Sequence, residues 1–278
     1  MEKESSMNVQ ELKAHANHVR QNILTAVYSG QSGHPGGSLS AADFLTYLYL
    51  EEMDVNKDNV KTLDRDRCVF SKGHVTPVIY SVLEEAGLLP EADITTFCQM
   101  ESPLQGHPNM NYIAAVDMST VSLGQGISCA VGMALANKLD KNGHRIFTVL
   151  GDGECQEGEV WEAAMAASHY ELDNLVVMVD CNHLQIDGKV EDVMNVYPLD
   201  KKFEAFGFEV VKANGHDFDS IKSAFDYVRG VRRKPACILW NTVKGKGVSF
   251  MEDQAGWHGS APNQEQYEQA MKELGGNK

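Results

Sequence analysis

Hydrophobic and polar positions follow two periodicities along this chain, and together they predict alternating strands and helices. Short apolar runs rich in β-branched residues predict buried strands at 68–71, 145–151, 174–182, 208–215 and 235–243. Apolar residues at helical spacing predict helices at 9–29, 41–52, 75–87, 158–169 and 220–229. This alternation is typical of a mostly parallel central sheet with helices on both faces, so we predict an α/β fold that forms one domain over residues 1–278.

Two segments between these elements are expected to be loops that contact a ligand. QSGHPGGS at 31–38 follows the first predicted helix and is rich in glycine. Residues 99–120 carry no periodic pattern, and irregular segments of that length inside a compact domain tend to be functional.

Polar residues stand at the ends of two successive predicted strands. Asp152 follows one strand within GDGECQEG, and Asn182 ends the next within DCNHLQIDG. The strand–helix–strand order is a βαβ unit, which places both residues at the carboxyl edge of one sheet. Their oxygens suit Mg²⁺ or Ca²⁺, while Gly153 and a helix N-terminus near Glu157 could approach a diphosphate. An ordinary turn or helix cap would account for either residue alone, but less readily for the pair.

Composition and charge narrow the possible partners and compartments. The chain has 278 residues and a formal net charge of −15, which disfavours nucleic acid and anionic membranes because no long basic run offsets it. The six cysteines form no C-x-x-C pair, as is usual in a reducing compartment. The N-terminal segment MEKESSMNVQ is polar, and no apolar run reaches the length of a membrane span, so we expect a cytoplasmic protein.

The spacing from GDG to Asn182 resembles the thiamine diphosphate signature, and further motifs narrow the resemblance to the transketolase family. In chain order they are SGHPGGS at 32–38, FSKGH at 70–74, GHPN at 106–109, SLGQGISCAVGMALA at 122–136 and GWHGSAP at 256–262. The match covers the diphosphate-binding domain of that family. It implies thiamine diphosphate with Mg²⁺, or with Ca²⁺ or Mn²⁺. It also implies transfer of a two-carbon ketol unit from a ketose phosphate to an aldose phosphate, as in the pentose phosphate pathway.

The same resemblance implies roles for individual residues. The metal would be bound by Asp152, Asn182 and the carbonyl of Leu184. The cofactor would be contacted by His74, Ser122, Leu123, Gly124, Gly153, Glu157, Asn182, Ile186 and His258. The catalytic histidines would be His34, His107 and His258, although in isolation each could be a structural residue. Ser122 departs from the proline that we expect before this Leu-Gly pair.

One required part of the family's active site is not expected on this chain. In the family a second α/β domain supplies a glutamate against the aminopyrimidine of the cofactor, and the residues after Gly259 are too few to form it. We therefore expect a split enzyme, in which this chain pairs with a C-terminal transketolase subunit that carries the pyrimidine-binding and C-terminal domains. The family makes an α2β2 heterotetramer, with self-association of this chain, the first expectation.

Three alternatives remain at the level of the sequence. The α-subunit of a 2-oxo acid dehydrogenase would share the GDG-to-Asn spacing but would lack the three histidine motifs at 32–38, 70–74 and 106–109. A specialised ketol transferase for an unusual sugar would share every motif, because the sugar phosphate would be bound mainly by the other chain. A non-catalytic or regulatory diphosphate-binding protein would have no need of four histidines near a cleft.

Overall fold

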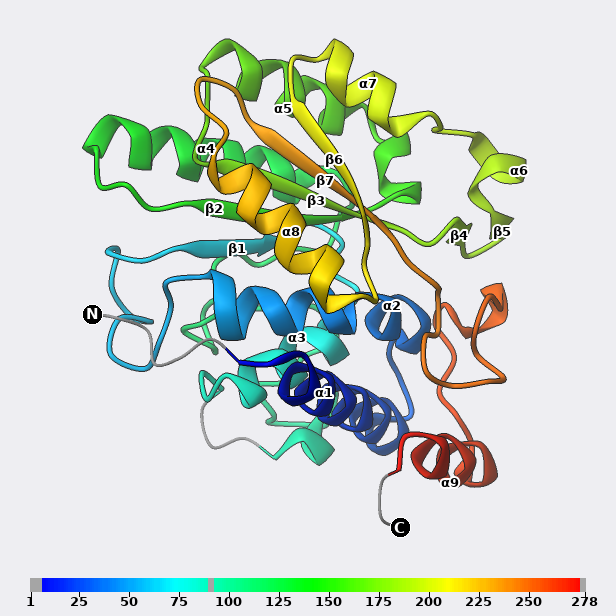
Figure 1. Ribbon diagram of the computed structural model, residues 1–278. Coiled ribbons are helices and arrows are strands. Elements are labelled where there is room, and N and C mark those ends of the chain that lie inside the picture. Colours follow the sequence, from blue (N-terminus) through cyan, green and yellow to red (C-terminus); the bar gives the residue numbers. More distant parts are fainter. Residues whose placement is uncertain (1–6, 90–92, 276–278) are drawn as a thin grey trace.

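The central sheet has five parallel strands, which confirms the predicted fold class. The computed structural model describes residues 7–89 and 93–275, and its strands lie in the order β1-β2-β3-β7-β6 (Figure 1). The strands are β1 (Arg67–Phe70), β2 (Ile146–Gly151), β3 (Leu175–Cys181), β6 (Glu209–Asn214) and β7 (Ala236–Asn241). Every neighbouring pair in this sheet is parallel, so the five strands end at the same edge. A small antiparallel hairpin, β4 (Leu184–Gln185) and β5 (Gly188–Lys189), follows β3 beyond that edge.

Helices lie on both sides of the sheet, as predicted (Figure 1). One side is occupied by α1 (Val9–Gly30), α2 (Pro35–Tyr47), α3 (Thr76–Glu85) and α8 (Phe218–Arg229). The other side is occupied by α4 (Gln125–Asp140), α5 (Gly158–His169) and α7 (Leu199–Ala205). The two remaining α-helices of the described residues, α6 (Val190–Met194) and α9 (Gln264–Glu273), lie at the periphery.

The central strand β3 supplies side chains to both cores. Val176 and Met178 belong to the hydrophobic cluster on the side of α1, whereas Leu175, Val177 and Val179 belong to the cluster on the side of α4. This division follows from the two-residue repeat of a strand, whose successive side chains point to opposite faces. Because both faces of this strand are buried, residues 175–179 read as an unbroken hydrophobic run.

The second helix begins earlier than the sequence predicted. We expected a loop through 31–38 and a helix from Ala41, but α2 starts at Pro35 and is continued by a π-helical turn, Leu48–Glu52. Proline is well suited to the first turn of a helix, because the N–H that it lacks would have no partner there. His34 is therefore held at the N-cap of α2 and does not lie in a free loop.

A buried ion pair joins α1 to α2 and extends to the segment after β7. The guanidinium of Arg20 donates to both carboxylate oxygens of Asp43, at 2.9 and 2.6 Å. His216 bonds to the same carboxylate through Nδ1 at 2.8 Å, and its Nε2 accepts the backbone N–H of Val243 at 2.9 Å, so the ring carries its proton on Nδ1. Burial acts to raise the pKa of Asp43, but Arg20 and His216 outweigh it and lower the pKa to about 2.

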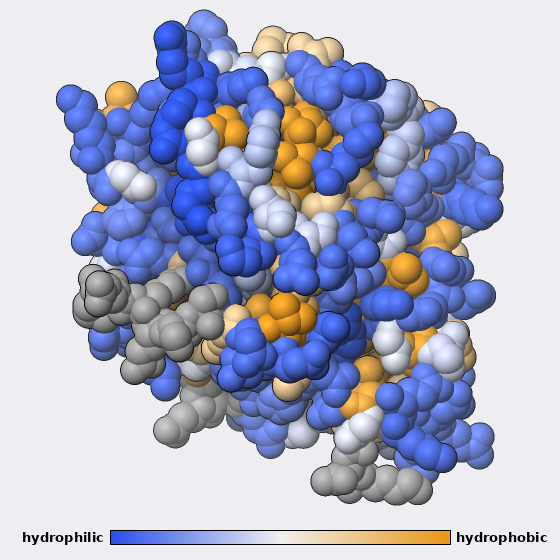
Figure 2. All heavy atoms as spheres, in the orientation of Figure 1, coloured by the Kyte–Doolittle hydropathy of each residue, from blue (hydrophilic) through white to orange (hydrophobic). Residues whose placement is uncertain are grey.

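The surface agrees with the acidic, polar composition. On the face drawn in Figure 2 most residues are hydrophilic, and the hydrophobic ones form small separate patches. Among the residues that the structure describes, no helix combines the length and the apolar character needed to cross a bilayer. Residues 1–6, which are part of the segment where we expected no targeting signal, lie outside the described residues.

Replacing Asp43 tests whether the buried pair holds the α1–α2 layer. We expect Asp43→Ala to lower the free energy of unfolding by about 3–5 kcal/mol, because the Arg20 guanidinium then stays buried without a carboxylate. Urea denaturation measures the change. Asp226→Ala is the matched control, because both of its partners, Lys222 and Arg229, are half exposed, and the loss of unfolding free energy should stay below about 1 kcal/mol. Equal losses in the two variants would contradict the prediction.

Candidate functional site

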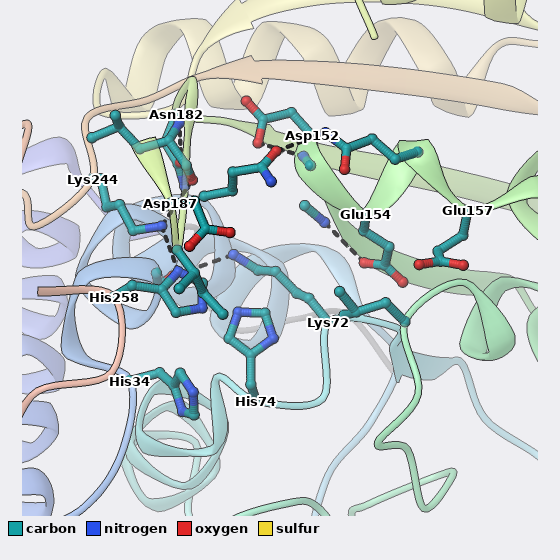
Figure 3. Close-up of a pocket in the computed structure, with 18 of the residues that line it drawn as sticks. His34, Lys72, His74, Asp152, Glu154, Glu157, Asn182, Asp187, Lys244 and His258 are labelled. Atoms are coloured by element: carbon teal, nitrogen blue, oxygen red, sulfur yellow. Dashed lines mark hydrogen bonds between the residues drawn. The ribbon is translucent and has the colours of Figure 1, made fainter. Parts of the chain in front are cut away.

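The carboxyl edge of the sheet is hollowed into a cavity of about 330 Å³ (Figure 3). It is lined by the loops that follow β1, β2, β3 and β7, where ligands of open parallel sheets usually bind. Its charged and imidazole side chains are those of His34, Lys72, His74, Asp152, Glu154, Glu157, Asp187, Lys244 and His258.

The structure brings the three predicted metal ligands together. Asp152 is 2% exposed, and its Oδ2 accepts the N–H of His183 at 2.7 Å and the hydroxyl of Tyr197 at 2.8 Å. Asn182 and Leu184 line the same cavity, and the Asn182 side-chain oxygen accepts the N–H of Leu184 at 3.2 Å. The strand-end argument predicted that Asp152 and Asn182 would be neighbours, and both line this cavity, although this placement by itself does not assign a metal.

The donor set fits a hard cation that also binds a ligand. One carboxylate, one amide and one backbone carbonyl offer oxygens, as Mg²⁺ prefers. Burial raises the pKa of Asp152, and the nearby charge of Asp180 adds to this, so a cation beside Asp152 would be favourable. Within residues 7–89 and 93–275, no three His, Cys, Asp or Glu side chains form a group that could hold a metal. An ion here would therefore depend on further oxygens, such as those of a diphosphate or water.

A fully buried carboxylate lies beneath the cavity. Asp180 in β3 accepts from Lys72 Nζ and from Ser40 Oγ, both at 2.5 Å, and from the amide of Asn182 at 3.1 Å. It also accepts the hydroxyl of Thr242, just after β7. Burial acts to raise the pKa of Asp180, but Lys72 and the hydroxyl donors bring it below its usual value. This carboxylate holds the residues after three strands at fixed positions.

A second buried lysine reaches the cavity from the segment after β7. Lys244 is 2% exposed, and its ammonium donates to the carbonyl of Leu184 at 2.8 Å and contacts His258 Nδ1 at 2.9 Å. Burial and the charge of Lys72 lower the pKa of Lys244 to about 8. Two buried ammonium groups thus face a cavity in a strongly acidic protein, which favours an anionic ligand.

Three of the four predicted histidines meet at one side of the cavity. The ring centroids of His34, His74 and His258 lie 5.0 to 5.4 Å apart. Burial, followed by the charges of His107 and Lys244, lowers the pKa of His34. Burial and the charge of Lys72 lower the pKa of His74 well below its ordinary value. These rings are therefore neutral near pH 7 and can both donate and accept hydrogen bonds.

The fourth histidine lies beside this group but outside the cavity lining. His107 belongs to segment 99–120, which contains no helix or strand, as predicted. The carbonyl of the preceding Gly106 accepts the hydroxyl of Thr76 at 2.9 Å, which fixes the loop against α3. His107 is close enough to His34 for its charge to lower the pKa of His34.

The predicted cofactor residues of segment 122–124 divide into two groups. Leu123 lines the cavity together with the predicted Ile186, and the two side chains are 38% and 67% exposed at its mouth. Ser122 and Gly124 do not line it; Gly124 instead donates its N–H to Glu154 at 2.8 Å. The apolar rim is thus formed by side chains that have no cover within the described part of this chain.

The predicted helix terminus is displaced from the diphosphate loop. Gly153 and Glu157 line the cavity, but a 3-10 helix, Gly153–Gln156, lies between Asp152 and α5. Asp152 caps that short helix, and Glu157 is the N-cap of α5. The N–H groups nearest to Gly153 therefore belong to the 3-10 turn and not to the first turn of α5.

The sequence interpretation missed several charged residues of the cavity. Lys72, Glu154 and Lys244 line it, and Asp180 lies beneath it, but none of them was predicted. A signal is present in the sequence, because Lys72 follows β1 and Lys244 follows β7 just as Asp152 follows β2. The rule that parallel strands end at one edge predicted Asp152 and Asn182, and it holds equally for the residues after β1 and β7.

Comparison with known proteins agrees with this geometry. The family model described as the thiamine diphosphate binding domain of transketolase matches residues 12–278. The chain belongs to the transketolase family. The transketolase structure from Campylobacter jejuni superposes with a TM-score of 0.91 at 35% identity, covering 98% of this chain and 44% of that one. The predicted thiamine diphosphate-binding fold is therefore confirmed.

The chain is similar both to transketolase subunits of its own length and to part of longer transketolases. An apulose-4-phosphate transketolase subunit from Phocaeicola vulgatus is 40% identical, over 96% of this chain and 95% of the relative. The 6-deoxy-6-sulfo-D-fructose transketolase subunit SqwG of a Clostridium species is also 40% identical, over 95% of this chain and 96% of the relative. Human transketolase is 38% identical over 98% of this chain, which spans 43% of its length. The predicted resemblance to the N-terminal subunit of a split transketolase agrees with these relatives.

The protonation of His258 provides a test of the electrostatics of the cavity. Burial, followed by the charge of Lys244, lowers the pKa of His258 to about 3. We expect its ring nitrogens to keep the NMR shifts of neutral imidazole from pH 8 to pH 5, with the signal assigned by its loss in His258→Gln. A titration midpoint near pH 6.5 would contradict this.

The same depressed pKa has a consequence for stability. The unfolded chain takes up the His258 proton first as pH falls below about 6.5, so stability is lost towards acid pH. Wild type should therefore lose more unfolding free energy than His258→Gln between pH 7 and pH 5. The difference is at most about 1.4 kcal/mol per pH unit, the limit for one proton, and smaller for a partly exposed ring.

Proposed function

We propose that this chain is the cofactor-binding subunit of a two-chain transketolase and holds the metal and the diphosphate of thiamine diphosphate. One observation carries the proposal. Asp152, Asn182 and Leu184, which carry oxygen donors, line one cavity at the sheet edge together with two buried lysines. Oxygen donors for a cation and ammonium groups for an anion together suit a metal diphosphate.

Each group in the cavity then has a distinct binding task. Asp152, Asn182 and the Leu184 carbonyl bind Mg²⁺, with Ca²⁺ or Mn²⁺ as substitutes. The hydroxyl of Tyr197 and the N–H of His183 hold the carboxylate of Asp152 in place, as outer partners of metal ligands commonly do. Lys72 and Lys244 supply positive charge to the diphosphate, and Gly153 and His74 lie beside it.

The cofactor, when bound, supplies the chemistry that cleaves and forms the carbon–carbon bond next to the ketose carbonyl. The chain positions the sugar and moves its protons. His34, His107 and His258 contact the sugar oxygens. Lys244 donates to His258 Nδ1, so the neutral His258 ring keeps its proton on Nε2, where it can be given to an oxygen.

The exposed apolar rim of the cavity is evidence for a second subunit that covers it. Val121, Leu123 and Ile186 are 63%, 38% and 67% exposed at the mouth of the cavity, and their burial by another chain would exclude water from the reaction. We propose that this chain contributes one domain and that the pyrimidine-binding and C-terminal domains belong to the partner. Relatives of the same length that are named as subunits support this division. An α2β2 heterotetramer and a cytoplasmic location complete the proposal.

The identity of the sugar admits two candidates. Ketose and aldose phosphates of the pentose phosphate pathway are the substrates that we propose first, from the likeness to full-length transketolases. A specialised ketol transferase is the second candidate, because the relatives of matching length are named for apulose 4-phosphate and 6-deoxy-6-sulfo-D-fructose.

The decisive activity experiment compares this chain alone with the two-chain complex. We expect ketol transfer, measured with thiamine diphosphate and Mg²⁺, only when the C-terminal subunit is present. Xylulose 5-phosphate, apulose 4-phosphate and 6-deoxy-6-sulfo-D-fructose as donors separate the two sugar candidates. Robust transfer by this chain alone would overturn the two-chain proposal.

An Asp152 variant tests the metal site in the same complex. Asp152→Ala should reduce activity at least about 100-fold and weaken cofactor binding, because a buried metal ligand is lost. Asp226→Ala, on the surface of α8, should leave both unchanged. Full activity of Asp152→Ala would place the metal elsewhere.

A further inference from the structure

Three loops of the cavity meet at the carboxylate of Glu154. The residue is 3% exposed, and its Oε1 accepts the hydroxyl of Ser71 and the N–H of Gly124, the latter at 2.8 Å. Its Oε2 accepts the N–H of Gly151 at 3.0 Å. Ser71 follows β1, Gly124 caps α4, and Gly151 ends β2, so one side chain connects three segments that are distant in sequence.

The backbones of these loops are in close contact around Glu154. A Cβ added to Gly126 would lie 2.6 Å from the Cα of Ser71, and one added to Gly73 would lie 2.5 Å from the carbonyl oxygen of Thr120. Real Cβ atoms do not approach so closely, so segments 71–74 and 120–126 are packed backbone against backbone. Hydrogen bonds fix the register of this contact: the hydroxyl of Thr120 donates to the carbonyl of Phe70 at 2.7 Å, and Glu154 adds its bonds to Ser71 and Gly124.

Each of the three loops carries a residue to which we have assigned a task. Segment 71–74 carries Lys72 and His74, segment 121–124 carries Leu123, and segment 151–153 carries Asp152. In Figure 3 the labelled Glu154 has Asp152 above it, Glu157 to its right and Lys72 below it. The position of each assigned residue thus depends on a loop that is bonded to Glu154.

We propose that Glu154 is a positioning residue, whose carboxylate sets the spacing of the three loops that surround the metal diphosphate. This inference deepens the proposed function and rests on it for the identity of the ligand. It assigns Glu154 no contact with the metal or the sugar.

The carboxylate is the group that the donors require. All three partners of Glu154 are donors, and an ionised carboxylate is an acceptor at every position. In Glu154→Gln one oxygen becomes an NH₂ group that must face an N–H or O–H donor. A buried donor left without an acceptor is costly, so the loop that carries it moves away.

The test compares this variant with a buried acid remote from the cavity. Glu52 has a side chain that is 1% exposed and bonds to Arg145 and Arg229, both at 2.5 Å. Glu52→Gln therefore removes a comparable buried charge without touching the cavity. Ser71→Ala is a milder second variant, because it removes one of the three donors and leaves the carboxylate in place.

Affinity for thiamine diphosphate in Mg²⁺ is measured by isothermal titration calorimetry on the two-chain complex. We expect the Kd to rise about tenfold or more in Glu154→Gln and about threefold in Ser71→Ala, and to stay within twofold in Glu52→Gln. The kcat of the positioning variants at saturating cofactor should recover to within about threefold of wild type, while the KM for cofactor stays high. A residue that served stability alone would lower the Tm like Glu52→Gln and leave Kd and KM unchanged, which would overturn the inference.

Hydrogen exchange on this chain without cofactor separates the inference from the proposed function. Peptides covering 68–75 and 119–127 should exchange at least about fivefold faster in Glu154→Gln than in wild type, and Glu52→Gln should leave them unchanged. If wild type binds no cofactor but these peptides exchange faster in Glu154→Gln, the proposed ligand is wrong and the positioning role stands. If wild type binds cofactor and neither exchange nor Kd changes in Glu154→Gln, the positioning role is wrong and the proposed function stands.

Discussion

The buried carboxylate of Asp180 is the interaction on which the geometry of the cavity depends. A carboxylate that is completely removed from water is stable only if charged and polar donors surround it. Lys72 after β1, Ser40 in α2 and Thr242 after β7 provide those donors. The hydrogen bonds of this one carboxylate therefore fix β1, β3, β7 and α2 relative to one another. The residues that follow these strands are held in place as a result.

The cavity above Asp180 combines opposite requirements in a small space. Its carboxylates can bind a cation, and its two buried lysines can bind an anion. Its histidines remain neutral because burial and the lysine charges oppose their protonation. Neutral rings can exchange hydrogen bonds with sugar hydroxyl groups without adding charge. The site is thus suited to a ligand that carries its own metal and its own negative charge, which a metal diphosphate does.

The sequence predicted those features that follow from local pattern and from the geometry of parallel strands. Asp152 and Asn182 were expected to be neighbours because both stand at strand ends, and the structure places them in one cavity. The predicted start of α2 at Ala41 was wrong, because the glycine-rich segment before it was interpreted as a loop. Pro35 in that segment favours the first turn of a helix. The family motifs identified the transketolase resemblance, which the relatives confirm.

Residues whose importance arises from burial could not be predicted in this way. Glu154 and Asp180 look like ordinary charged residues in the sequence, and their roles follow from contacts between distant positions, such as the 108 positions that separate Asp180 from Lys72. Ser122 and Gly124 stand in the expected motif, yet the cavity lining includes Leu123 and neither of its neighbours. Sequence pattern thus locates the loops, but packing decides which side chains reach the ligand.

The most direct test of the metal diphosphate site is anomalous diffraction from crystals of the two-chain complex grown with Mn²⁺ and thiamine diphosphate. The proposed site predicts one manganese peak at about 2.0–2.3 Å from an oxygen of Asp152, the side-chain oxygen of Asn182 and the carbonyl oxygen of Leu184, with diphosphate oxygens completing the shell. A peak bound by other residues, or cofactor density without metal at these three oxygens, would contradict it.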